Sequence, residues 1–154
     1  MELSLILKPD AVRAVHGVSS KKRLFQDLAD LAKVVYGLDS MVALNSLQER
    51  ESLGPTGVGH GVALPHARLD GLERVSGVFF RLDKAFDYGS VDKAPVDLVF
   101  ALFAPRDAGV DHLKALALVS RTLRDPAVCR QLRANTDAAT LHAVLTAARD
   151  IKAA

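Results

Sequence analysis

The longest nearly unbroken apolar run in the chain is Val96-Asp-Leu-Val-Phe-Ala-Leu-Phe103. Its short length and its large apolar side chains predict a strand that is buried on both faces. The run Val75-Ser-Gly-Val-Phe-Phe-Arg-Leu82 precedes it and is rich in β-branched and aromatic residues, which also predicts a strand. No helical pattern separates the two runs, and so short a connection favours antiparallel pairing.

Helical patterns surround these two strands. Capping residues and apolar periodicity predict five helices, from Ser19 or Ser20 to Gly37, from Asp39 or Ser40 to about Ser52, from beyond Gly109 to Leu123, from Asp125-Pro126 to near Asn135, and from Thr136 or Asp137 through Leu145. The first begins with three cations, Lys21 to Arg23, which we interpret as a solvated basic end. Residues 1–18 are expected to form an extended segment or a short strand, and residues 68–71 a turn. We therefore predict an α/β fold, a single-domain mixed β-sheet sandwiched by helices over residues 1–154.

Composition narrows the class of protein. The 154 residues are 49% hydrophobic and 25% charged, which is typical of a globular domain. The formal net charge of +2 is spread along the chain, and only 5% of residues are aromatic, so a nucleic-acid partner is not expected. The N-terminus has no basic region typical of a signal peptide, and no apolar stretch approaches the roughly 20 residues that span a bilayer. A cytoplasmic protein without membrane insertion is the expectation.

A glycine-rich stretch suggests where the chemistry lies. It reads Gly54-Pro-Thr-Gly-Val-Gly-His-Gly-Val-Ala-Leu-Pro-His-Ala-Arg68. Dense glycines permit positive φ angles and close backbone approach, and they can leave N–H groups free to face a bound anion. His66 follows the rigid Pro65 at the end of this stretch. Our working hypothesis is that His66 is the reactive group.

Four kinds of site can be weighed against this stretch. A dinucleotide fingerprint lacks the preceding strand and the following helix, and a phosphate-binding P-loop lacks the Gly-Lys-Ser/Thr that should follow. A zinc site from His60, His66 and His112 lacks ligand spacing on a shared helix and has no cysteine pair. The remaining interpretation is a histidine nucleophile that takes a phosphoryl group on a ring nitrogen. No cofactor and no metal are expected.

Phosphoryl acceptance makes three demands of the chain. The attacking nitrogen must be unprotonated near pH 7, and a hydrogen bond must hold the other ring nitrogen. The phosphoryl dianion needs donors, which the glycine stretch, Arg50 and His112 can supply. Arg50 lies near the predicted end of the second helix, where it either complements the helix dipole or is held ready for an anion near His66.

The run Leu47-Gln-Glu-Arg-Glu-Ser-Leu-Gly-Pro-Thr-Gly-Val-Gly-His-Gly-Val-Ala-Leu-Pro-His66 resembles the active-site segment of the mannitol/fructose-type IIA component of the bacterial phosphotransferase system. The resemblance is greatest to the nitrogen-regulatory branch and extends from about residue 15 over nearly the whole chain. It implies a mixed sheet covered by helices. It also implies that His66 is phosphorylated by an HPr-like phosphocarrier and that Arg50 and His112 flank the phosphoryl group.

The resemblance leaves the protein's partners open. The absence of an appended IIB or IIC segment favours a regulatory phosphocarrier, which forms a phosphohistidine intermediate and acts on target proteins such as potassium transport or sensor-kinase systems. One alternative is the IIA subunit of a fructose or mannitol transporter, which passes phosphate to a IIB domain. Another is an interaction module that accepts no phosphate. Two positions depart from the family pattern. His60 stands where the family often has asparagine or an acid, and Ala67 stands where the family usually has glycine.

Overall fold

A mixed β-sheet forms the centre of the molecule. The computed structural model describes residues 1–153, with side chains up to residue 147. Within this range the sheet has six strands in the order β1-β5-β6-β3-β2, and β4 also pairs with β6. The strands are β1 (Val12–Val15), β2 (Gly57–Gly59), β3 (Val62–Ala63), β4 (His66–Leu69), β5 (Ser76–Phe86) and β6 (Val96–Pro105).

The two strands predicted from the apolar runs form the middle of this sheet. β5 and β6 are antiparallel, with Val78 opposite Ala101 and Phe80 opposite Val99. Residues 98–104 of β6 are all buried, as expected of a strand covered on both faces. β1 pairs with β5 in parallel, and β3 and β4 pair with β6 in parallel. The predicted antiparallel pair and mixed sheet are therefore confirmed.

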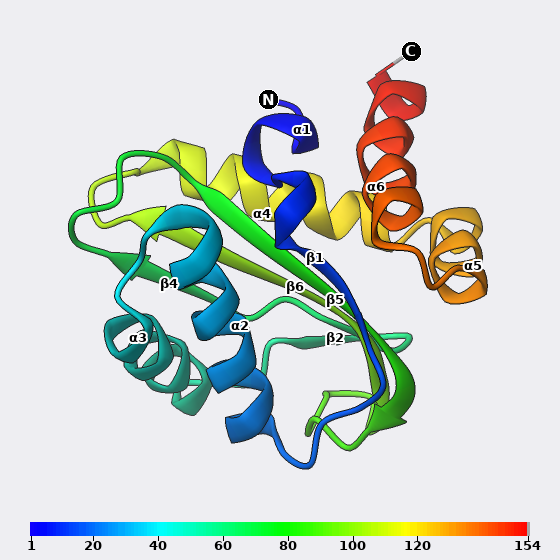
Figure 1. Ribbon diagram of the computed structural model, residues 1–154, viewed down its shortest axis with the longest axis horizontal. Helices are drawn as coiled ribbons and strands as arrows, with labels where there is room; N and C mark the ends of the chain where they lie inside the picture. The colour runs from blue at the N-terminus through cyan, green and yellow to red at the C-terminus, as the bar shows by residue number, and fades with distance from the viewer. Residues whose placement is uncertain (154) are drawn as a thin grey trace.

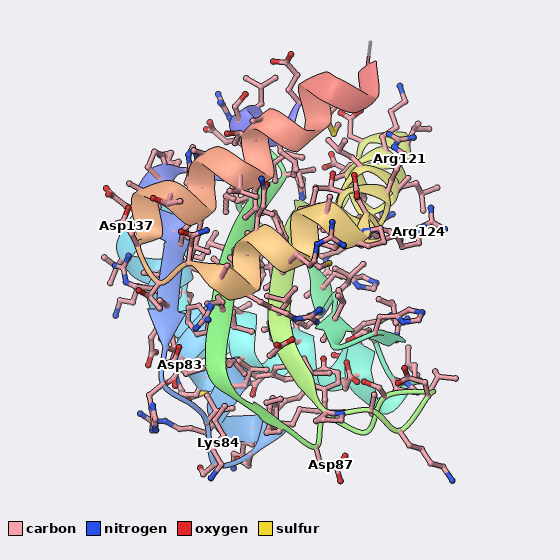
Figure 2. All side chains as sticks on the ribbon, turned by 90° about the vertical axis from the view of Figure 1, so that its right-hand side faces the viewer. Asp83, Lys84, Asp87, Arg121, Arg124 and Asp137 are labelled. Carbon is pink, nitrogen blue, oxygen red and sulfur yellow. The ribbon has the colours of Figure 1, made fainter. Side chains whose placement is uncertain are left out.

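Helices cover both faces of the sheet. α2 (Lys21–Tyr36) packs on β5 and α3 (Ser40–Ser52) packs on β4, while α4 (Val110–Leu123) contacts β6 and α6 (Ala138–Ala153) contacts β1. Figure 1 shows α2 in front of the sheet and α4 behind it. In the side view of Figure 2, α5 (Pro126–Ala134) and α6 cross over β5 and β6. None of the helices in residues 1–153 is long and apolar enough to cross a membrane.

Local capping chemistry sets the helix boundaries that the sequence predicts. The Ser20 hydroxyl accepts a hydrogen bond from the Arg23 N–H at 3.0 Å, and α2 ends at Gly37 with φ of 75°. The Asp39 carboxylate caps α3 in the same way, accepting from the Val42 N–H at 3.0 Å. These side chains satisfy N–H groups that have no partner within the helix.

Two predictions about irregular segments are corrected. Residues 1–18 contain not only the expected short strand but also a helix, α1 (Leu3–Ile6), and a 3₁₀ turn, η1 (Pro9–Ala11). The helix forms because packing buries Leu3 completely, and four residues are too few to show a period. The predicted turn at 68–71 begins later, because β4 continues to Leu69 along β6 and only Asp70 and Gly71 lie in the turn.

The glycine-rich stretch forms an ordered hairpin rather than an open loop. β2 and β3 are antiparallel, and Gly61 beside β3 has φ of 81°. A Cβ atom at Gly57 would lie 2.1 Å from the Ser90 hydroxyl oxygen and 2.9 Å from the Ser90 Cα. Gly57 is therefore needed for the close approach of two buried backbone segments.

We predict that Gly57→Ala destabilises the protein by about 1–3 kcal/mol, because the added methyl group overpacks this contact. Urea unfolding followed by circular dichroism measures the change. Gly17→Ala is the matched control, since the nearest atom to its Cβ is the Lys84 Cβ at 3.5 Å, an ordinary contact distance. Equal free energies of unfolding of the two variants would show that the hairpin accommodates the added methyl group without loss of stability.

Candidate active site

A cavity of about 390 Å³ opens between α3, β4 and the start of α4. It brings together the three residues that the sequence predicts as functional, from positions distant in the chain. Its lining residues are Ser46, Glu49, Arg50, Leu53, His66, Ala67, Arg68, Arg106, His112, Leu113 and Leu116. The lining thus combines two histidines and three arginines with a few apolar side chains.

His66 is held in one tautomer. It is the first residue of β4, and its Nδ1 lies 2.9 Å from the carbonyl oxygen of Leu64. A carbonyl oxygen can only accept a hydrogen bond, so Nδ1 must carry the proton. Nε2 of the neutral ring is therefore the nitrogen with a free lone pair. Next to it, the Leu102 N–H of β6 donates to the Pro65 carbonyl at 3.0 Å and fixes the backbone that presents the ring.

The electrostatic environment keeps His66 neutral. Burial lowers the pKa of its ring below the usual value of 6.5, and the positive charge of Arg50 lowers it further. The hydrogen bond to Leu64 and the charge of Glu51 act in the opposite direction but do not outweigh burial. At pH 7 the ring is therefore unprotonated, as phosphoryl acceptance would require.

His112 lies in the first turn of α4 and is only 5% exposed. Its ring meets that of His66 edge-on, with 5.4 Å between the ring centroids. Arg68 Nε donates to His112 Nδ1 at 3.1 Å, and His112 Nε2 has no hydrogen-bond partner among the described residues. Burial, the neighbouring His66 and the charge of Arg68 lower the pKa of His112 to about 4. The ring is a neutral donor with an unpaired N–H.

Arg50 lies in the last turn of α3, on the side of the cavity formed by that helix. Its Nη1 donates to the Gly54 carbonyl at 3.0 Å, which anchors the guanidinium at the edge of the glycine-rich stretch. A guanidinium has five N–H donors, so this single bond leaves others for an anion. The cavity can therefore offer a nucleophile, a neutral donor and a cation to one bound group.

Residues 5–148 match the family model described as phosphoenolpyruvate-dependent sugar phosphotransferase system, EIIA 2. The chain belongs to this family. The resemblance noted from the sequence is thereby confirmed, because the predicted component and the matched family are the same.

Similar proteins place this EIIA 2 chain near the nitrogen-regulatory branch. It is 45% identical to a nitrogen regulatory protein of Bradyrhizobium diazoefficiens over 94% of this chain and 95% of the relative. Among solved structures, the nitrogen regulatory protein IIA-Ntr of Neisseria meningitidis superposes with a TM-score of 0.86 at 32% identity, covering 94% of this chain and 99% of that one. The mannitol IIA of Escherichia coli shares the fold, with a TM-score of 0.75 at 18% identity over 90% of this chain and 97% of the other.

Sequence reasoning missed Arg68 and Arg106 in this EIIA 2 site. The sequence predicts a turn at Arg68, whereas this residue lies two positions after His66 on the same strand and contacts His112. Its Nη1 donates to the Arg106 carbonyl at 3.1 Å, and Arg106 Nε donates to Asp70 at 2.8 Å. The spacing His66-Ala-Arg68 could have indicated Arg68, because alternate residues of a strand share one face.

The expected anion cradle of glycine N–H groups is corrected. The glycines of the stretch do not line the cavity that contains His66. His60 lies in the turn between β2 and β3, where its N–H donates to Asp92 and its carbonyl accepts from Arg133. It lines a separate cavity of about 660 Å³ beside α5, so it does not join His66 and His112. Residues 1–147 contain no group of three side chains suited to a metal ion.

The neighbour of Arg50 in the sequence has a structural role. The Glu51 side chain is 8% exposed and accepts from the Thr56 N–H at 3.0 Å, from the Thr56 hydroxyl and from Lys21 Nζ at 3.0 Å. The Tyr88 hydroxyl donates to it at 3.2 Å. Burial alone would raise the pKa of Glu51, but the hydrogen bonds from Thr56 and Lys21 hold it below its usual value. Lys21 is thus paired, which corrects its interpretation as part of a solvated end.

We predict that the stability of this EIIA 2 protein falls as the pH drops from 6.5 toward 4. Unfolded His112 binds a proton with a pKa near 6.5, whereas the folded ring resists it down to about 4. The unfolded state therefore holds more protons in this interval, and the loss amounts to about 3 kcal/mol. Urea unfolding at several pH values measures it. His112→Gln should flatten the slope, and His16→Gln, at a side chain that is 89% exposed, should leave it unchanged.

Proposed function

We propose that this protein is a phosphocarrier of the nitrogen-type phosphotransferase system, which accepts a phosphoryl group on Nε2 of His66 from an HPr-like carrier. The observation that carries the proposal is the pairing of a neutral nucleophile with an unused donor. The lone pair of His66 lies on Nε2, and the buried N–H of His112 in the same cavity has no acceptor among the residues whose side chains the structure describes. A phosphoryl oxygen is an acceptor that would satisfy this N–H.

The transfer requires little covalent work from the protein. The lone pair of His66 Nε2 forms the new N–P bond while the N–P bond of the donor phosphohistidine breaks, and the donor imidazole leaves with the bonding electrons and later takes up a proton from solvent. His66 Nδ1 keeps its proton on the Leu64 carbonyl, so no base has to remove one from the nucleophile. Arg50 and His112 stabilise the charge on the phosphoryl oxygens.

The mouth of the cavity favours a protein as the donor. Leu53 is 81% exposed and Leu113 is 63% exposed, and both line the cavity. A small phosphate compound would gain little from these side chains, whereas a docking protein would bury them at the centre of an interface. This arrangement supports a phosphocarrier protein as the source of the phosphoryl group.

A regulatory role fits the relatives better than sugar transport. The relative that is 45% identical over nearly its whole length is a nitrogen regulatory protein. The structure of a mannitol IIA in complex with a phosphorylated IIB is only 16% identical, so the likeness concerns the fold. We therefore propose that the phosphorylation state of His66 controls target proteins. A transport subunit would instead pass phosphate rapidly to a IIB domain, which a transfer assay distinguishes.

We predict that phosphoenolpyruvate, enzyme I and an HPr-like carrier together label this protein at one acid-labile site. His66→Ala abolishes the label, because the attacking nitrogen is gone, while His60→Ala retains it. Intact-protein mass spectrometry at neutral pH counts the phosphoryl groups. Labelling that persists in the His66 variant would exclude this assignment, and a wild-type protein that accepts no phosphate would favour a pure interaction module.

We predict that Arg50→Ala folds but accepts phosphate roughly a hundred- to a thousandfold more slowly. The loss corresponds to about 3–4 kcal/mol of transition-state stabilisation, by analogy with the removal of an oxyanion donor. Quenched-flow labelling measures the rate, and thermal melting checks the fold. Arg130→Ala is the control, because this exposed arginine lines the other cavity. An unchanged rate in Arg50→Ala would leave the arginine with no role beyond the helix end.

A further inference from the structure

We propose that Arg68 is a positioning residue that fixes the tautomer of His112, so that the Nε2–H of this ring is the donor presented to a phosphoryl group on His66. The second part of this inference, donation by His112 to a phosphoryl group, rests on the proposed function. The tautomer itself is a property of the unphosphorylated protein. It follows from a contact between two residues that stand 44 positions apart in the chain.

The direction of the Arg68–His112 hydrogen bond decides the tautomer. Arg68 Nε lies 3.1 Å from His112 Nδ1. A guanidinium nitrogen has only hydrogens to offer, so His112 Nδ1 must accept and must be unprotonated. A neutral imidazole with a bare Nδ1 carries its single proton on Nε2. The opposite tautomer would place two N–H groups against each other and would leave a bare Nε2 unable to donate.

The other end of the ring shows what this tautomer is for. The Nε2 atom of His112 is inaccessible to solvent and has no hydrogen-bond partner among the described residues. Native structures rarely leave a buried N–H unpaired, and a role in catalysis is one recognised reason for such an exception. The ring lies edge-on to His66 in the same cavity. A phosphoryl group on His66 brings oxygen acceptors to this place.

Strand β4 gives Arg68 a fixed position. His66 pairs with Leu102 and Arg68 with Ala104 in the parallel register along β6, so the nucleophile and the positioning residue stand two residues apart on one strand. The second contact of Arg68, from Nη1 to the Arg106 carbonyl at 3.1 Å, holds the guanidinium plane from its other side. Two bonds in different directions leave the guanidinium little freedom to turn away from His112.

The charge of Arg68 acts in the same sense as its hydrogen bond. A cation beside His112 opposes a second proton on the ring, and the ring stays neutral at pH 7. The donor offered to the phosphoryl group is thus a neutral N–H, and the positive charge in the cavity comes from the arginines. This arrangement separates two tasks, because the histidine supplies direction while the guanidinium groups supply charge.

The test measures the tautomer directly by NMR. Long-range ¹H–¹⁵N correlation spectra of the unphosphorylated, ¹⁵N-histidine-labelled protein distinguish a bare ring nitrogen from a protonated one. In the wild type we expect His112 to show a bare Nδ1 and a protonated Nε2. In Arg68→Met, which keeps an unbranched chain as far as the position of Nε but has no donor, we expect a mixture of tautomers. Arg130→Met is the matched control, because it makes the same substitution at an exposed arginine that lines a different cavity.

The phosphorylation rate provides the second readout. We expect Arg68→Met to accept phosphate roughly ten- to a hundredfold more slowly, by analogy with the loss of hydrogen-bond partners that orient metal-binding histidines. Arg130→Met should stay close to the wild type. The proposal is overturned if His112 keeps one pure Nε2–H tautomer in Arg68→Met, or if the tautomer changes and the rate does not.

A wild-type protein that shows the expected tautomer but accepts no phosphate overturns the proposed function. It also overturns the donation by His112 to a phosphoryl group, while the tautomer assignment stands.

Discussion

The hydrogen-bonded ladder along β6 is the constraint on which the site depends. One edge of β6 pairs with β5, and the other pairs first with β3 and then with β4. Because β6 is buried, each of these hydrogen bonds lies away from water. A shift in register would leave buried backbone N–H and C=O groups without partners. The register places His66 opposite Leu102, and the chain that leaves β6 enters α4 with His112 in its first turn. The two histidines meet because one strand determines both positions.

Charge in the cavity acts on the histidines and on the proposed ligand at once. Burial lowers the pKa of both rings, and the charges of Arg50 beside His66 and of Arg68 beside His112 lower it further, so both rings stay neutral near pH 7. The same cations attract a phosphoryl dianion. A cavity with carboxylates in their place would protonate the rings and repel the phosphoryl group. Positive charge in the cavity therefore acts in one direction on both, because it favours the neutral form of each imidazole and attracts an anionic ligand.

Sequence patterns predicted the parts of the fold that local chemistry determines. Ser20, Asp39 and Gly37 mark helix ends through hydrogen bonds and φ angles of their own residues, and β5 and β6 follow from residue type. Strand β4 was missed because its four residues include an arginine and lead into Asp-Gly, and only its pairing with β6 makes it a strand. The glycines correctly indicated a close approach to the backbone, but the sequence does not show which group approaches. At Gly57 this group is Ser90 and not an anion. For the site, the residues themselves indicated His66, Arg50 and His112 and the family resemblance implied their roles, whereas Arg68 was recognised through its contact with His112.

The end of α3 shows how stability and the site are joined through adjacent residues. Arg50 faces the cavity, and Glu51 turns toward Thr56, Tyr88 and Lys21 of α2. Successive residues of a helix project in different directions, so one turn can serve the solvent-facing site and the interior together. Breaking a nearly buried carboxylate from its partners is far more costly than losing an exposed pair. The Glu51 contacts therefore hold the last turn of α3 in place, and with it the guanidinium of Arg50 beside His66.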